Sequence, residues 1–280
     1  MKSVGIFGYP ISHSISPIFQ QAAFDHLRIN AKYDSWSVEP KFLGKRITEL
    51  RDQNFLGCNV TIPHKVAAKE YVDKLDPLAK KIGSINTIVN RNQELVGYNT
   101  DIGGFIRSLV VYGKFDPKGK SALVIGAGGA ARAAVYGLKS EGASSISIVN
   151  RTVAKAEAIA AEFLNDKVVA EPLCNMNSLM LSNDFSLVVN CSSMGMKGGF
   201  AELVSPMDFH KVRNDMFIYD MVYIPEMTPF LKLAQENRNR YLGGLSMLVM
   251  QGAESFELWT GESAPEDVMF AAAEKAVYSR

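Results

Sequence analysis

The segment Val124–Ala131, with the sequence VIGAGGAA, restricts the fold more than any other part of this 280-residue chain. It continues the apolar run Ser121–Ile125 and opens an alanine-rich stretch, so it predicts a strand, a tight turn and a helix. Gly126, Gly128 and Ala131 have the G-x-G-x-x-A spacing of a dinucleotide-binding turn. The first glycine permits the turn, and the second lets a pyrophosphate approach the N–H groups at the helix start. A plain tight turn is the alternative.

The end of the next expected strand, Ser145–Asn150, indicates which dinucleotide is bound. NAD sites usually carry an acidic residue there, which accepts hydrogen bonds from the ribose 2′-hydroxyl. This chain has Asn150-Arg151-Thr152 instead, with no carboxylate. A guanidinium suits a 2′-phosphate, so the sequence favours NADP over NAD. The alternative is that Thr152 caps a helix and Arg151 is a solvated surface charge.

Short apolar runs alternate with segments of helical period along the chain, which indicates an α/β protein with parallel sheets. Strands are expected at Val4–Gly8, Lys32–Val38, Leu56–Ile62, Ser84–Asn90, Glu94–Tyr98, Ser121–Ile125, Ser145–Asn150, Val168–Ala170, Leu187–Asn190 and Met216–Tyr219, with a hairpin over 84–98. Helices are expected at Ser16–Ile29, Pro40–Arg51, His64–Val72, Asp101–Val111, Thr152–Leu164, Ser246–Thr260 and Pro265–Tyr278, and from the glycine turn to about Ser140. A doubly wound unit therefore spans about residues 104–243, and the last two helices fit either unit.

Composition excludes several classes of protein. The 30 basic and 29 acidic side chains give a net charge of +1, which provides no basic surface for nucleic acid or an anionic membrane. Three widely spaced cysteines do not form a disulfide framework, and no metal-binding spacing is present. The opening MKSVGIFGYPISHSISP is not typical of a signal peptide. We expect a cytoplasmic protein without a metal.

Four polar motifs stand at the expected strand ends and helix starts of the first hundred residues: His13-Ser14-Ile15-Ser16-Pro17, Asn59-Val-Thr61-Ile-Pro-His-Lys65, Ser84-Ile-Asn86-Thr87 and Tyr98-Asn-Thr-Asp101. Ser16 is expected to cap a helix that has Pro17 at its first position. Ser14 has no such explanation, and two hydroxyls beside free helix N–H groups are a site for a small carboxylate.

Lys65 and Asp101 are the residues of this set that could move a proton. Both lie just past strand ends, where open α/β sheets bind their ligands. Taken singly, Lys65 reads as a solvated surface lysine and Asp101 as a helix cap. Their concentration in one small unit beside a dinucleotide site favours a proton-transfer pair.

These motifs together resemble the shikimate dehydrogenase family of NADPH-dependent enzymes along nearly the whole chain. The matching segments are GYPISHSISP, GCNVTIPHK, GSINT, GYNTD, GAGGAA, NRT, NCSSMGM, YDMVYIPEMTP and GLSMLVMQGA. The resemblance implies an α/β protein of two domains. An N-terminal substrate domain would comprise residues 1–102 and the returning C-terminal helices 245–280, and a Rossmann-like NADP-binding domain would comprise residues 103–244.

The resemblance also implies roles for individual residues. Lys65 and Asp101 would be the catalytic pair. The substrate-binding positions would be Ser14, Ser16, Thr61, Asn86, Asp101, Tyr223 and Gln251. The NADP-binding positions would be Gly126, Ala127, Gly128, Gly129 and Ala130 for the pyrophosphate, Asn150, Arg151, Thr152 and Lys155 for the 2′-phosphate, and Met221 and Gly244 near the nicotinamide. The chain departs from the common pattern at Gln20-Gln21, Cys58, His64 and Ser84, of which Gln20 and His64 could tune substrate fit.

The activity implied is the reversible reduction of 3-dehydroshikimate to shikimate in chorismate and aromatic amino-acid biosynthesis. Two alternatives stay open: a quinate/shikimate dehydrogenase of broader specificity, and a protein that senses NADP(H) without turnover. The partners expected are the small-molecule substrate and NADPH, with no nucleic acid or membrane, and a homodimer is one assembly to test.

Overall fold

The computed structural model describes residues 1–163, 167–182, 184–199, 201–209 and 212–278. Its packing divides the chain into two units, residues 1–104 with 248–280 and residues 105–247. These boundaries lie two to three residues from the expected domain limits. The C-terminal helices pack with the first unit, a point that the helical periodicity left open.

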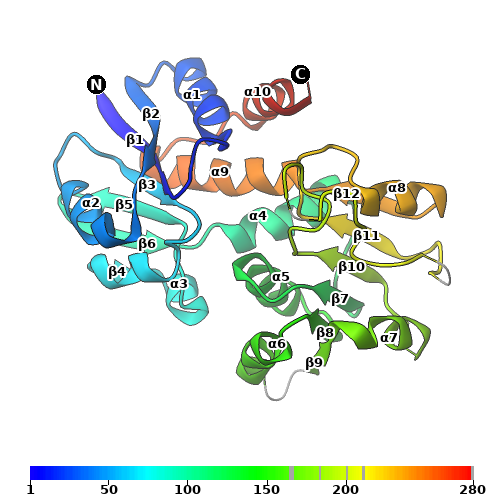
Figure 1. Cartoon of the computed structure of the whole chain (residues 1–280). Helices are drawn as coiled ribbons and strands as arrows, with labels where there is room; N and C mark the ends of the chain where they lie inside the picture. Colours follow the sequence, from blue (N-terminus) through cyan, green and yellow to red (C-terminus); the bar gives the residue numbers. More distant parts are fainter. Residues whose placement is uncertain (164–166, 183, 200, 210–211, 279–280) are drawn as a thin grey trace. The chain divides into compact units, whose positions relative to one another are not determined.

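The first unit contains a six-stranded sheet with the strand order β2-β1-β3-β5-β6-β4 (Figure 1). Its strands are β1 (Lys2–Gly8), β2 (Ala31–Ser37), β3 (Gly57–Val60), β4 (Lys74–Leu75), β5 (Thr87–Arg91) and β6 (Glu94–Tyr98). The sheet is mixed: β1 pairs parallel with β2 and β3, as the sequence predicts, and β5 pairs antiparallel with both β3 and β6. The expected hairpin supplies this reversal, since Asn92 and Gln93 adopt positive φ between β5 and β6.

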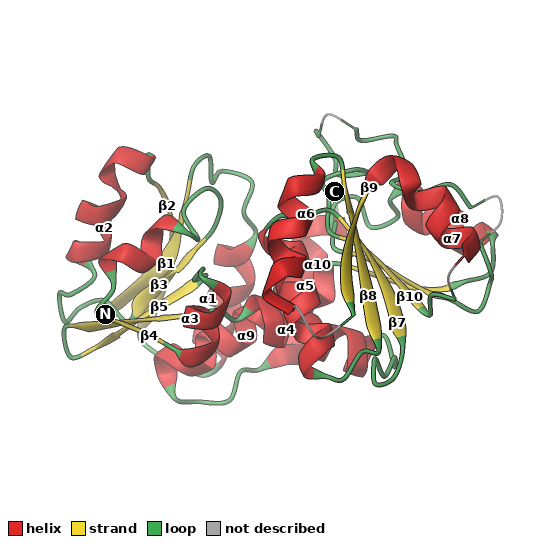
Figure 2. Ribbon diagram, turned by 90° about the horizontal axis from the view of Figure 1, so that it is seen from below, coloured by secondary structure: helices red, strands yellow, loops and turns green. Residues whose placement is uncertain are grey.

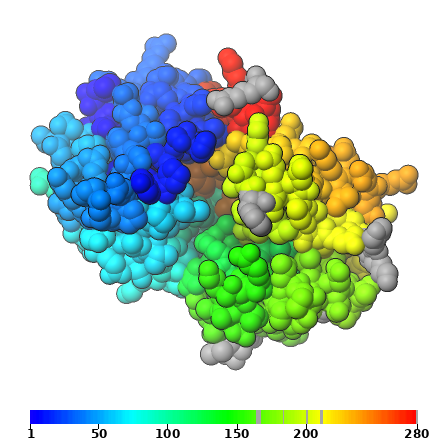
Figure 3. All heavy atoms as spheres, in the orientation of Figure 1, coloured from blue at the N-terminus to red at the C-terminus, as the bar shows by residue number. Residues whose placement is uncertain are grey.

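The helices of the first unit are α1 (Ser16–His26), α2 (Leu43–Glu49), α3 (Pro77–Ile82), α4 (Asp101–Arg107), α9 (Leu245–Thr260) and α10 (Glu266–Tyr278), of which α4 and α9 continue across its boundary. Helix α10, red in Figure 3, packs against α1, which is blue. Phe7, Val60 and Ile88 are buried in the core of this unit. A fully buried side chain of this size contributes about 1.5–3 kcal/mol to the free energy of unfolding.

The second unit contains a parallel six-stranded sheet with the order β12-β11-β10-β7-β8-β9, which confirms the doubly wound fold. Its strands are β7 (Ser121–Ile125), β8 (Ser145–Asn150), β9 (Val168–Pro172), β10 (Leu187–Asn190), β11 (Phe217–Asp220) and β12 (Arg240–Gly243). Its helices are α5 (Gly129–Ser140), α6 (Val153–Ala160), α7 (Met176–Ser182) and α8 (Pro229–Glu236). Figure 2 shows α5 and α6 on one face of this sheet and α7 and α8 on the other.

Several expected elements differ from the structure. The helix expected at His64–Val72 is only a 3₁₀ turn over Ala67–Tyr71, and the helix expected from Asp101 ends at Arg107 in a π-helical turn, Ser108–Tyr112. The short β4 and β12 and the helices α3, α7 and α8 were not expected. Leu164, the expected end of a helix, lies outside the described residues.

Candidate active site

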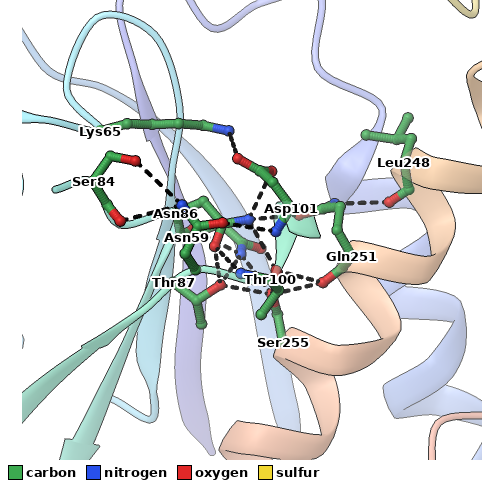
Figure 4. A network of polar contacts seen from close by, with 11 residues as sticks. Asn59, Lys65, Ser84, Asn86, Thr87, Thr100, Asp101, Leu248, Gln251 and Ser255 are labelled. Atoms are coloured by element: carbon green, nitrogen blue, oxygen red, sulfur yellow. Dashed lines mark hydrogen bonds and ion pairs between the residues drawn. The ribbon is translucent and has the colours of Figure 1, made fainter. Parts of the chain in front are cut away.

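Lys65 and Asp101 form an ion pair in the first unit. Lys65 Nζ lies 2.6 Å from Asp101 Oδ2, and the two side chains are 27% and 10% exposed (Figure 4). Lys65 follows β3, and its carbonyl accepts a hydrogen bond from Ile85 N (2.9 Å). Asp101 begins α4, and its carboxylate points to side chains rather than serving only as a helix cap. The pair that the sequence predicts is therefore formed.

Asn86 joins this ion pair to the C-terminal helix α9. Its Nδ2 donates to Asp101 Oδ1 (3.0 Å) and lies within hydrogen-bond distance of Gln251 Oε1 (3.2 Å). Its Oδ1 accepts from Thr100 N (2.8 Å), which fixes the orientation of the amide. Four of the predicted site residues, Lys65, Asn86, Asp101 and Gln251, thus belong to one connected network (Figure 4).

A second polar layer lies beneath this network; its residues Asn59 and Thr87 stand in the polar motifs, whereas Ser255 and Tyr33 were missed from the sequence. Ser255 Oγ lies 2.8 Å from Thr87 Oγ1 and accepts from Asn59 Nδ2 (3.0 Å), while Asn59 Oδ1 accepts from the Tyr33 hydroxyl (2.7 Å). These side chains are buried, so each hydrogen bond replaces one lost to water. Ser255 stands four residues after Gln251 on one helix face, which is the signal that could have identified it.

The serine motif is arranged differently from the expected cap. Helix α1 starts at Ser16 with Ile15 in the cap position, and Ser14 Oγ accepts from Ser16 N (3.3 Å). The prediction that Ser16 caps the helix is therefore wrong. Ser16 is buried, and Ser14 and Thr61 are half-buried. Within the described residues, no hydrogen bond links these three hydroxyls to the Lys65 network, and their contact with a carboxylate stays a prediction.

Gln20 and His64, which depart from the common pattern of the resembled family, are buried and held by the main chain. Gln20 Nε2 donates to Gly252 O (2.8 Å), and His64 Nε2 lies 2.7 Å from Val38 O. Both contacts lie within the first unit and fix its fold locally.

The glycine turn of the second unit has the geometry that its sequence predicts. Gly126 has φ +110°, and a Cβ there would lie 3.1 Å from the main chain of Cys191, so a larger residue is disfavoured both by the main-chain conformation and by the close contact. A Cβ on Gly128 or Gly129 would meet nothing within 4 Å, so the space beside the helix start is open. Ala131, in the third position of the motif, is fully buried. Open N–H groups at the start of α5 fit a pyrophosphate.

The end of β8 presents polar and basic groups to solvent. Arg151, Thr152 and Lys155 are exposed, and Asn150 Nδ2 donates to Thr152 O (2.8 Å). Thr152 occupies the cap position of α6, as the alternative interpretation expects, although its side chain makes no cap hydrogen bond. A guanidinium and an ammonium within five residues fit a 2′-phosphate.

Met221 and Gly244 lie together at the ends of β11 and β12. A Cβ on Gly244 would lie 2.1 Å from Met221 O, so this approach requires glycine. Tyr223, two residues after Met221, is half-buried, and burial raises the pKa of its phenol. It belongs to the second unit, and its predicted role in binding the substrate stays a prediction. Among the described residues no group of three His, Cys, Asp or Glu could hold a metal ion.

Comparison with known proteins gives consistent matches over most of the chain. Family models match residues 6–88 (shikimate dehydrogenase substrate binding domain), 111–198 (shikimate/quinate 5-dehydrogenase) and 244–274 (shikimate 5′-dehydrogenase C-terminal domain). A shikimate dehydrogenase (NADP(+)) of Geobacter sulfurreducens is 41% identical over 282 residues, covering 99% of this chain and 98% of that protein. One of Desulforamulus reducens is 40% identical over 268 residues, covering 95% and 92%.

Among solved structures, the shikimate 5-dehydrogenase of Thermus thermophilus in complex with NADP(H) and shikimate superposes with a TM-score of 0.87. It is 34% identical in sequence and covers 99% of this chain and 100% of its own. No helix in the described part of the chain is long and apolar enough to cross a membrane. The identity, the coverage and the doubly wound sheet agree, and the chain belongs to the shikimate dehydrogenase family.

Proposed function

We propose that this chain catalyses the reversible NADPH-dependent reduction of 3-dehydroshikimate to shikimate. It is then an oxidoreductase that acts on a CH–OH group, in chorismate and aromatic amino-acid biosynthesis. The observation that carries this proposal is the Lys65–Asp101 ion pair with Asn86 and Gln251 hydrogen-bonded beside it. Relatives about 40% identical over nearly the whole chain are shikimate dehydrogenases that use NADP.

Lys65 supplies the proton that the reduction needs. When a ketone becomes an alcohol, a hydride adds to the carbonyl carbon and a proton to the oxygen. The Lys65 ammonium donates that proton, and general acid catalysis of this kind contributes typically about 10²–10⁴-fold to the rate. Asp101 Oδ2 holds the ammonium at 2.6 Å, and Asn86 holds the other carboxylate oxygen at 3.0 Å. In the reverse direction Lys65 accepts the proton from the hydroxyl.

The remaining predicted residues of the first unit bind the substrate. We assign Ser14 and Ser16 to the carboxylate, because their hydroxyls stand at the start of α1, where N–H groups favour an anion. Asn86 and Gln251 carry amides that can pair with ring hydroxyls, and we assign Thr61 and Tyr223 to the same task. An alicyclic acid with several hydroxyls matches this set of donors and acceptors.

The second unit binds the cofactor through its glycine turn and the end of β8. When bound there, NADPH supplies the hydride. Gly126 to Ala130 would hold the pyrophosphate with main-chain N–H groups, and Arg151 and Lys155 would pair with the 2′-phosphate. We assign Met221 and Gly244 to the nicotinamide end, at the ends of β11 and β12.

The proposal is tested by following NADPH absorbance when the purified chain is mixed with shikimate and NADP. The account predicts turnover with these two compounds and slower turnover with quinate or with NAD. NADPH binding without turnover of shikimate would instead support a sensor, and faster turnover of quinate would support the broader enzyme. The cytoplasmic location and the homodimer stay predictions, and light scattering on the purified chain tests the second.

A further inference from the structure

Asp220 is a buried carboxylate in the second unit that the proposed chemistry does not use. It ends β11 and is fully buried. Its Oδ1 accepts hydrogen bonds from Asn190 Nδ2 (2.9 Å) and Val222 N (3.0 Å), and its Oδ2 accepts from Thr228 Oγ1 (2.6 Å). All three partners are neutral. A buried charge satisfied only by neutral donors is costly, so such a residue needs a reason beyond the stability of the fold.

The three donors lie at one edge of the sheet, one at the end of β10 and two in the connection after β11. Asn190 ends β10 and is paired in register with Asp220, while Val222 and Thr228 lie in the connection from β11 to α8. Asn190 Oδ1 in turn accepts from both the main chain and the hydroxyl of Ser192 (3.0 and 2.7 Å). One carboxylate therefore links the loop after β10 to the loop after β11.

This link fixes the main chain on both sides of Met221. Met221 N donates to Asn190 O (2.9 Å), and the next residue, Val222, donates to Asp220 and accepts from Gly244 N (3.2 Å). The loop after β10 also borders the glycine turn, since a Cβ on Gly126 would touch Cys191. Of these contacts, the one from Val222 N ends on the Asp220 carboxylate, which also accepts from the side chain of Asn190, so Asp220 supports the position of Met221 through both of these residues.

In a doubly wound sheet, the two halves of a dinucleotide bind at the ends of different strands. The 2′-phosphate side of the cofactor belongs at the end of β8, so the nicotinamide half belongs across the strand-order reversal, at the ends of β10 and β11. Resting on the proposed function, we infer that Asp220 is a positioning residue for the nicotinamide half of NADPH, acting through Met221 and the loop after β10.

If Asp220 positions only the nicotinamide half, its loss weakens the binding of that half and not of the adenosine half. Two ligands that differ in the nicotinamide half test this. NADPH carries both ends, whereas adenosine 2′,5′-bisphosphate carries the adenosine and the 2′-phosphate but no nicotinamide. In Asp220→Asn the dissociation constant of NADPH should rise roughly ten-fold, as for the loss of one hydrogen bond to a charged group. That of adenosine 2′,5′-bisphosphate should stay within about two-fold. Both are measured by calorimetry, with the melting temperature recorded alongside.

A second pair of variants carries the same test if Asp220→Asn does not fold. Thr228→Val removes the hydroxyl that donates to Oδ2, while Thr228→Ser keeps it. Thr228 Oγ1 also accepts from Leu231 N (3.2 Å), so the valine variant lowers the melting temperature by weakening a helix cap. Only the positioning role predicts that Thr228→Val also weakens the binding of NADPH more than that of adenosine 2′,5′-bisphosphate. It further predicts that Thr228→Ser binds NADPH as the wild type does.

Equal weakening of both ligands, or unchanged NADPH affinity in a folded variant, would overturn the inference. NADPH binding and shikimate oxidation by the wild-type chain are measured first, so that failure of the proposed function can be told from failure of the role of Asp220. If it binds no NADPH, the proposed function fails. If it binds NADPH and oxidises shikimate while Asp220→Asn binds NADPH normally, only the role of Asp220 is wrong.

Discussion

Lys65 Nζ lies 2.6 Å from Asp101 Oδ2, although the two residues stand 36 positions apart in the chain. The carboxylate is held from the other side by Asn86, so the ammonium has a fixed partner rather than a mobile one. Charge-assisted hydrogen bonds of this length are among the stronger ones in proteins. The arrangement orients a proton donor in the part of the first unit that carries the polar motifs.

Asp101→Asn should lower kcat by about 10–10²-fold, because the amide cannot hold the ammonium of Lys65 in place. Steady-state kinetics with shikimate and NADP measures the change. Asp73→Asn is a matched control, since Asp73 also forms a 2.6 Å ion pair, with Arg51, on the surface of the same unit. It should leave kcat unchanged and cost at most about 1 kcal/mol of unfolding free energy. Equal effects of the two substitutions would contradict the role of Asp101.

Arg151→Ala should weaken the binding of NADPH far more than the binding of NADH. A bidentate charged contact with the 2′-phosphate contributes about 1.5–3 kcal/mol, which corresponds to roughly ten- to over one-hundred-fold in affinity. Dissociation constants for both cofactors give the ratio. Lys232→Ala, which removes an exposed charge on α8, controls for the change in net charge. Similar losses for NADPH and NADH would show that Arg151 does not recognise the phosphate.

Ser14→Ala should raise KM for shikimate with a smaller change in kcat, because anchoring a carboxylate stabilises the ground state and the transition state alike. The loss of the hydrogen bond from Ser16 N should cost about 1 kcal/mol or less of unfolding free energy. Ser12→Ala, at an exposed position of the same loop, is the control. A fall in kcat at unchanged KM would argue for a different role.

Asp220 predicts a pH dependence of stability with a definite sign. Burial raises the pKa of Asp220 to about 6, and the three hydrogen bonds lower it by less than burial raises it. An unfolded aspartate has a pKa of about 3.9. The folded state therefore takes up the proton first. Between about pH 8 and about pH 5 the wild type should gain roughly 1.4 kcal/mol of unfolding free energy relative to Asp220→Asn.

Two neighbouring groups do not obscure this titration. Burial raises the pKa of the Cys191 thiol and of the Tyr219 phenol, so both stay neutral throughout this range. Denaturant unfolding at several pH values measures the difference between the wild type and Asp220→Asn. A difference that is constant with pH would show that Asp220 titrates below this range.

The fold of the second unit could be predicted because its central strands are buried on both faces and read as continuous apolar runs. The 3₁₀ turn at Ala67–Tyr71 could not be predicted. The Lys65 carbonyl accepts from Ile85 N, so a long-range contact takes up a main-chain acceptor that a longer helix would use, and the His64 side chain is held by Val38 O. Helix α3 went unnoticed although Asp76 caps it, because it is only six residues long.

The site was predictable where its residues stand in short motifs at strand ends, as Lys65 and Asp101 do. Ser255 was missed, because its partners Asn59 and Thr87 lie 196 and 168 positions away in the sequence and its only local signal is the spacing of four residues from Gln251. Asp220 left a weaker signal, a single carboxylate at the end of the apolar strand Phe217–Asp220. Two of its donors, Val222 and Thr228, follow it in the chain, but the third, Asn190, ends a strand 30 positions earlier, and no local pattern records that contact.

Lys65 protonates the substrate oxygen in the proposed reaction, and the kcat of Lys65→Ala measures the contribution of this proton donor. Lys69→Ala is the control, since Lys69 lies nearby and is 31% exposed, close to the 27% of Lys65. The account predicts a fall in kcat of about 10²–10⁴-fold for Lys65→Ala, with the NADPH dissociation constant within about two-fold of wild type. Near-normal turnover by folded Lys65→Ala would contradict it.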